Sequence, residues 1–184
     1  NQKVKTIAEI FIGFGILFTG MDFMKNAVAP LKEFQGFTNM LVNFGHHPIL
    51  GILLGFGITA IVQSSSASMG MLLALASGGL IPLAAALPIL YGENIGTCVT
   101  SLISSIGASK NARRAALVHL YFNVLGTSLF MIAFYSINAF VDFTFMDMSA
   151  QEYQIAVIHS AFNIMATVVL FPFAGVLEKL ACLT

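Results

Sequence analysis

Four polar side chains in a row interrupt a largely apolar part of the chain. Gln63 is followed by three hydroxyl side chains, Ser64, Ser65 and Ser66, within residues 48–79. In a membrane interior, such groups are costly unless they bind one another or a ligand. One serine in a membrane helix usually bonds the carbonyl four residues before it, but three serines after a glutamine fit that explanation poorly. The segment therefore predicts a helix break that binds ions, because free N–H groups attract an anion and oxygens coordinate a hard cation.

A second polar stretch, YGENIGTCVT, lies at residues 91–100. Gly92 and Gly96 are expected to free the backbone there, which predicts a discontinuous helix. Glu93 is the only acidic residue deep in this region, and we consider three roles for it: cation ligand, proton carrier, or residue at a cavity mouth. The further candidate ligands all carry side-chain oxygens, and they are Asn94, Thr97, Thr100 and, beside the first polar run, Ser68.

A short repeat places histidine and asparagine at equal spacing in two later segments. Residues 115–127 match residues 155–167, so His119 and Asn123 correspond to His159 and Asn163. Residues four apart share a helix face, and we predict that these side chains hold helices together or brace the hairpin by hydrogen bonds. A direct role in proton or ligand binding is the alternative. Two histidines without nearby cysteines or paired acids do not indicate a transition-metal site.

The composition requires a surrounding of lipid for these elements. The chain has 184 residues, of which 58% are hydrophobic and only 9% charged, and its mean hydropathy is +0.90. Soluble domains carry about 25% charged residues, so this chain is predicted to be an all-α, multi-pass protein of the cell membrane. Eight basic and eight acidic residues cancel, which gives no field toward nucleic acid. Two distant cysteines do not make a disulfide scaffold.

The apolar runs divide one predicted domain, residues 1–184, into membrane elements. Residues 48–79 would be about 48 Å long as one helix, too long for a bilayer core of about 30 Å, so a re-entrant hairpin with its tip at the polar run is predicted. Residues 31–45 have one apolar stripe, which predicts an amphipathic helix at the interface or a helix packed on its neighbours. The other predicted elements are transmembrane helices at 6–29, 112–140 and 151–177 and the broken helix at 81–106.

Charge placement orients part of the chain. Lys110, Arg113 and Arg114 form the densest basic loop, which we assign to the cytoplasm. The positive-inside rule does not decide the side of the amino end. The opening segment, with lysines but no small-residue cleavage site, is interpreted as the start of a span and not as a signal peptide.

The two polar stretches together resemble the signature of a known family. Gln63-Ser64-Ser65-Ser66-Ala67 followed by Gly92-x-Asn94-Ile95-Gly96-Thr97 is similar to the paired motifs of the sodium-dependent phosphate cotransporter family. The resemblance covers most of the chain. It departs at Cys98, where a second Thr or Ser is common, and at Glu93, where a small residue is frequent.

The resemblance implies a central site for inorganic phosphate and sodium, lined by both motifs. It implies sodium ligands at Gln63, Ser65, Asn94 and Thr97, with sodium as the coupling ion and no other cofactor. Members of the family have two such glutamine-serine elements, whereas this chain has one. The chain therefore resembles one half, most similar to the second, of a two-repeat transporter, and the other repeat is expected as its partner. We predict that Gln63 to Ser66 converge in space with Asn94 and Thr97.

These features favour sodium-coupled symport of phosphate over an enzymatic function. A channel or a regulatory membrane module is the first alternative. An intramembrane serine hydrolase, using Ser64 to Ser66 with His119 or His159, is the second. No Gly-x-Ser-Gly elbow accompanies those serines, which weighs against the hydrolase.

Overall fold

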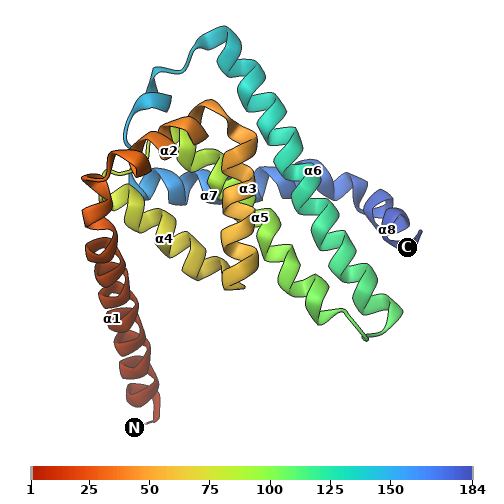
Figure 1. Cartoon of the computed structure of the whole chain (residues 1–184). Coiled ribbons are helices and arrows are strands. Elements are labelled where there is room, and N and C mark those ends of the chain that lie inside the picture. The colour runs from red at the N-terminus through yellow and green to blue at the C-terminus, as the bar shows by residue number, and fades with distance from the viewer. Residues whose placement is uncertain (1, 184) are drawn as a thin grey trace.

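The structure, a computed structural model, describes residues 2–183 and is built of helices (Figure 1). Residues 1 and 184, the ends of the predicted domain, lie outside the described residues. Within the described part, the only β pairing is an isolated bridge between Pro82 and Ser149. In chain order the elements are α1 (Gln2–Val28), η1 (Ala29–Lys32), α2 (Gln35–His46), α3 (Pro48–Val62), α4 (Ser65–Ser77), α5 (Leu83–Ser104), α6 (Lys110–Val141), η2 (Thr144–Asp147), α7 (Glu152–Leu170), η3 (Phe171–Phe173) and α8 (Ala174–Cys182).

Three segments are long and apolar enough to cross a membrane: Gln2–Leu31, Lys110–Val141 and Glu152–Cys182. None of the most apolar window of the first is buried inside the structure. Large apolar side chains there, such as Phe11 and Ile16, face outward. This surface requires lipid or another protein to cover it, so the chain is an all-α membrane protein.

The last predicted span changes from α-helix to a 3₁₀ turn where its sequence contains a proline, although Glu152–Cys182 still forms one span. We expected one helix over residues 151–177, but α7 ends at Leu170 and the 3₁₀ turn η3 holds Pro172 before α8 begins. Proline has no N–H to donate and clashes with the preceding turn, which explains the interruption. The predicted helices at 6–29 and 112–140 fall almost entirely within α1 and α6.

The predicted break in residues 48–79 lies at Gln63 and Ser64, between α3 and α4. Gln63 has φ 54° and ψ 26°, the left-handed conformation that ends a helix. Ser64 is extended and begins α4 as its N-cap. The two helices therefore form a helix-break-helix hairpin, and its re-entrant course relative to the membrane stays a prediction.

The discontinuous helix predicted over residues 81–106 is wrong, because Leu83–Ser104 forms the single helix α5. Gly92 and Gly96 do not unwind it. Both are buried against α3, and a Cβ at Gly92 would clash with the carbonyl of Ile52. The glycines thus serve close helix contact and leave the backbone hydrogen bonds of α5 in place.

The backbones of α3 and α5 approach one another closely. Gly51 lies against Pro88, Gly55 against Ile89, and Thr59 against Gly96. Since residue numbers rise together on both helices, α3 and α5 run in the same direction. Small residues four apart on one or both helices let two backbones approach in this way.

The helix after η1 is shorter than predicted and packs on α5. We expected a helix over residues 31–45, but α2 begins at Gln35, and Leu41 is only 1% exposed in the core around α5. α2 and α3 meet at a bend of 115°. The packed-helix alternative therefore describes α2, and its position at a membrane interface stays a prediction.

Candidate functional site

The Gln63–Ser66 segment forms an exposed, capped helix start. The Gln63 N–H donates to the Thr59 carbonyl at 2.7 Å, which closes the end of α3. The Ala67 N–H donates to Ser64 Oγ at 3.3 Å, and the hydroxyls of Ser64 and Ser66 lie 3.3 Å apart. Because the left-handed backbone reverses the chain after Val62, α4 starts anew from its own cap.

This helix start leaves hydrogen-bonding groups free on an accessible face. The N–H groups of Ser65 and Ser66, at the first two positions of α4, have no acceptor within the helix. The side chains of Gln63, Ser65 and Ser66 are exposed. Such an arrangement can bind an anion through the amides and a cation through the neighbouring oxygens.

The predicted partners on α5 are engaged elsewhere. Asn94 donates from Nδ2 to the Leu90 carbonyl at 3.3 Å, and its Oδ1 lies 3.1 Å from His159 Nε2 on α7. The Thr97 hydroxyl donates to the Glu93 carbonyl at 2.9 Å. Among the described residues, no hydrogen bond joins Gln63–Ser66 to either side chain. Their convergence stays a prediction.

The register of α3 on α5 explains this separation. With Thr59 beside Gly96, the same register places Gln63 at the level of Thr100, one turn beyond the polar centre of α5. Asn94 is two residues from Gly92, so its side chain points to the opposite face of the helix. Thr100 is exposed and is therefore the predicted residue of α5 nearest in level to the break.

Both histidines hydrogen-bond within the protein, as predicted. His119 Nδ1 lies 3.3 Å from Ser101 Oγ, and His159 bonds Asn94, so each joins its own helix to α5. Asn123 and Asn163 each donate to the carbonyl of the histidine four residues before them, at 3.0 and 2.9 Å. The histidine and asparagine of the repeat thus make matching hydrogen bonds.

One partner in this network was not predicted from the sequence. Ser101 follows Asn94 by seven residues, or about two helical turns, so both lie on one face of α5. The matching spacing could have identified it. Cys98 lies between them, fully buried, with its Sγ 3.5 Å from the His119 carbonyl.

Glu93 lies buried between α2, α3 and α5, and its role as cation ligand, proton carrier or residue at a cavity mouth stays a prediction. It is 4% exposed, because the α3–α5 contact and α2 enclose it. Among the described residues, its Oε2 has no hydrogen-bond partner, and the same holds for the hydroxyls of Thr59 and Ser68. Glu93 and Ser68 were candidate ligands by sequence, but their burial follows only from packing.

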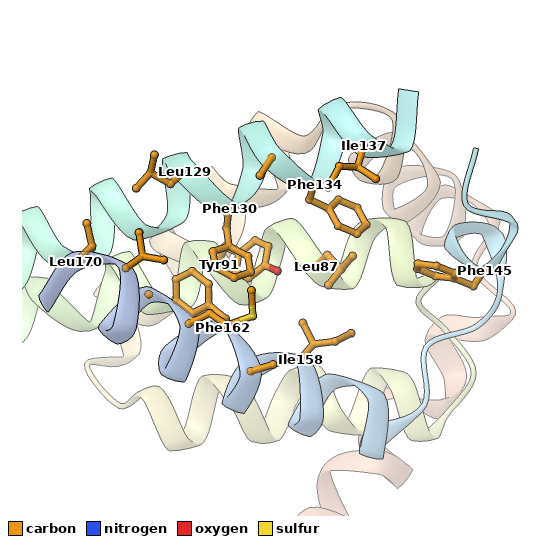
Figure 2. A pocket seen from close by; sticks show the side chains of 16 residues that line it. Leu87, Tyr91, Leu129, Phe130, Phe134, Ile137, Phe145, Ile158, Phe162 and Leu170 are labelled. Carbon is orange, nitrogen blue, oxygen red and sulfur yellow. The ribbon is translucent and has the colours of Figure 1, made fainter. Parts of the chain in front are cut away.

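A large cavity among the described residues is apolar and does not suit phosphate. It has a volume of about 540 Å³ and lies between α5, α6 and α7 (Figure 2). The rings of Tyr91 and Phe130 pack on Phe162, with centroids 4.9 and 5.1 Å from it. A dianion there would lose its hydration without gaining hydrogen bonds, so the hairpin tip is the better candidate site.

A family model named Na+/Pi-cotransporter matches residues 31–167. The chain belongs to the Na+/Pi-cotransporter family. The matched region contains the α3–α4 hairpin, all of α5 and α6, and both histidines. The resemblance seen in the two polar motifs is thereby confirmed.

Bacterial and animal proteins are similar to this chain. The uncharacterized protein YqeW of Bacillus subtilis is 28% identical over 180 residues, which cover 98% of this chain and 58% of YqeW. Sodium-dependent phosphate transport protein 2B of Homo sapiens is 37% identical over 126 residues, covering 63% of this chain and 18% of that protein. Protein 2A of Rattus norvegicus, also named a sodium-dependent phosphate transport protein, is 40% identical over 85 residues, covering 43% and 13%.

The chain thus spans little more than half of YqeW and less of the animal relatives. No solved structure is significantly similar to it.

Proposed function

We propose that this chain is one half of a sodium-coupled symporter that carries inorganic phosphate across the cell membrane as a multi-pass protein. The observation that carries the proposal is the exposed start of α4 at Gln63–Ser66, inside the region matched by the family model. Its free amides suit the phosphate oxygens. The carbonyls at the end of α3 and the nearby hydroxyls suit sodium, which prefers oxygen ligands.

The accessibility of the break supports a site completed by a second repeat. Ser65 and Ser66 are exposed in this half alone, although polar groups at membrane depth require protein or water around them. A matching element from the second repeat, in the same native chain or another subunit, would enclose the site. Thr100, level with Gln63, would then lie on the α5 side of it, whereas the proposed sodium ligands Asn94 and Thr97 would have to exchange the hydrogen bonds that they make within this half.

The alternatives receive less support. A serine hydrolase requires a histidine hydrogen-bonded to its nucleophile, but His119 bonds Ser101 and His159 bonds Asn94. The sodium and phosphate in the family's name favour a transporter over an enzyme. A channel would differ from a symporter in lacking saturable uptake that depends on a sodium gradient.

The test is phosphate uptake by the full-length protein that contains this chain. The protein would be purified, placed in proteoliposomes and supplied with radiolabelled phosphate, with and without an inward sodium gradient. Saturable uptake that requires sodium is expected. Uptake that is unsaturable, or equal in sodium and choline, would contradict the proposal.

A further inference from the structure

The apolar cavity between α5, α6 and α7 is a groove that opens between two helices. Its volume is about 540 Å³, and its floor includes Leu87 and Tyr91 of α5, each 3% exposed (Figure 2). Its rim is about half exposed, at Leu129 of α6 and at Met165 and Val169 of α7. Side chains that face a space without matching atoms lose dispersion contacts, so the groove suits an occupant that restores them.

The chemistry of the lining selects a hydrocarbon. Among the described residues that line the groove, none is charged, and Tyr91 carries the one side-chain oxygen. A bound water needs roughly 2–4 polar partners, and apolar cavities without them stay dry and bind apolar molecules. Neither water nor a polar solute therefore suits this groove.

The shape of the groove fits a thin, linear chain and not a helix. Its lining extends over residues 126–137 of α6 and 158–170 of α7, a length of about 17–18 Å at 1.5 Å per residue. The rings of Phe130 and Phe162 bridge α6 and α7, with centroids 5.1 Å apart. An α-helix, about 10–12 Å across with its side chains, cannot pass this contact to reach α5.

The groove also lies where lipid hydrocarbon surrounds the protein. Its two walls belong to Lys110–Val141 and Glu152–Cys182, which are both long and apolar enough to cross a membrane. We propose that the groove binds one acyl chain of a membrane phospholipid, which packs on Leu87 and Tyr91 and thereby joins α5, α6 and α7. The site is separate from the Gln63–Ser66 break, and the inference does not depend on phosphate or sodium.

The experiment asks whether an acyl chain reaches the buried floor of the groove. The full-length protein would be placed in phosphatidylcholine vesicles that contain a phosphatidylcholine with a diazirine in the middle of one acyl chain. After illumination, mass spectrometry of the peptides locates the label. Lipid around the protein reaches exposed side chains only, so label on the α5 peptide with Leu87 and Tyr91 is the expected result. Label confined to α6 and α7 would overturn the proposal.

Filling the groove should remove the label from α5. Ala133→Phe on α6 and Ala161→Phe on α7 add a ring at residues that line the groove, so each variant should lose most of that label. Ala139→Phe and Ala156→Phe are the matched controls, because these alanines are exposed on the same two helices outside the lining. Both controls should be labelled like the parent protein. Parental label on α5 in both groove variants would contradict the proposal.

The test remains decisive if the larger substitutions do not fold. Ala133→Leu and Ala161→Leu make the same comparison with a smaller side chain, and the label on α5 of the parent protein requires no variant. An unlabelled α5, together with chemical cross-links from Leu129 or Met165 to the second repeat, would refute the lipid site and assign the groove to a protein contact. Phosphate uptake does not enter the readout, so failure of the proposed function would leave this result unchanged.

Discussion

Two segments of this chain look alike in sequence but differ in the fold. Both Gln63–Ser66 and Gly92–Thr97 place polar and small residues between apolar flanks. The first ends one helix and starts another, whereas the second lies inside the uninterrupted α5. Local backbone and capping account for the first, and packing against a neighbouring helix accounts for the second.

At the first segment, the chain itself supplies the break. Ser64 caps α4, and Gln63 adopts a left-handed backbone that a helix cannot continue through. At the second, Gly92 and Gly96 are covered by α3. A run of hydroxyls is therefore a signal for a helix start, while glycines four residues apart in an apolar helix are a signal for helix contact.

The largest expected effect comes from widening the α3–α5 contact. Gly55→Ala and Gly92→Ala should each lower the free energy of unfolding by about 1–3 kcal/mol or more, because a Cβ would meet backbone atoms of Ile89 or Ile52. The measurement is the melting temperature of the full-length protein in detergent.

Gly57→Ala on the same helix is the matched control, since a Cβ there meets nothing within 4 Å. Alanine favours a helix over glycine by about 1 kcal/mol, so this variant should keep or gain stability. Equal melting temperatures of Gly55→Ala and Gly57→Ala would contradict a close α3–α5 contact at Gly55.

The second-largest expected effect concerns phosphate uptake and the helix break at Gln63–Ser66. Ser65→Ala and Asn94→Ala should lower sodium-dependent phosphate uptake by about tenfold or more while leaving membrane insertion intact, because each removes an oxygen from the proposed site. Uptake would be measured in proteoliposomes at matched protein amounts. Ser160→Ala, whose hydroxyl bonds only the Ala156 carbonyl, should transport normally. Normal uptake in both site variants would mean that the wrong residues are named.

A third, smaller effect tests the hydrogen bond between α5 and α7. Asn94→Ala and His159→Ala should show a coupling of about 0.6 kcal/mol, and less than 2, in a double-mutant cycle of unfolding free energies. The cycle of Asn94→Ala with His119→Ala is the comparison, and it should be additive because His119 bonds Ser101 instead. Coupling of equal size in both cycles would contradict the separate pairings.

The smallest effects should have opposite signs at neighbouring residues of the break. Gln63→Gly relieves a positive φ and should raise stability by at most about 1 kcal/mol, whereas Ser64→Ala removes the cap of α4 and should lower it by about 1 kcal/mol. Thermal unfolding of both variants gives the comparison. A loss of stability in Gln63→Gly would indicate that the glutamine side chain, and not the backbone, holds the turn.

The position of the hairpin break could be predicted because its cause is local. The segment is too long for one span, and three hydroxyls can compete for backbone groups at its centre. The hydrogen bonds of His119 and His159 were predictable for a related reason. A polar side chain in a membrane helix must find a partner, and the two matching segments implied matching partners.

The continuity of α5 could not be predicted in the same way. Glycine and proline weaken a helix in isolation, and only a neighbouring backbone can turn that weakness into a favourable contact. The same limit applied to Glu93. Its three interpretations differed in where α2, α3 and α4 lie around α5, and the sequence near residue 93 contains no information on that arrangement.

The amino-acid sequence by itself determined an all-helical membrane chain, the break at Gln63 and Ser64, and the family to which the paired motifs belong. These follow from composition, length and short motifs, whose effects act within a few residues. The tertiary structure alone decided that Gly55 and Gly92 join two helices, that Asn94 meets His159, and that Glu93 and Ser68 are buried. Such contacts depend on the register and rotation of one helix against another, which are set by the sum of many weak packing interactions.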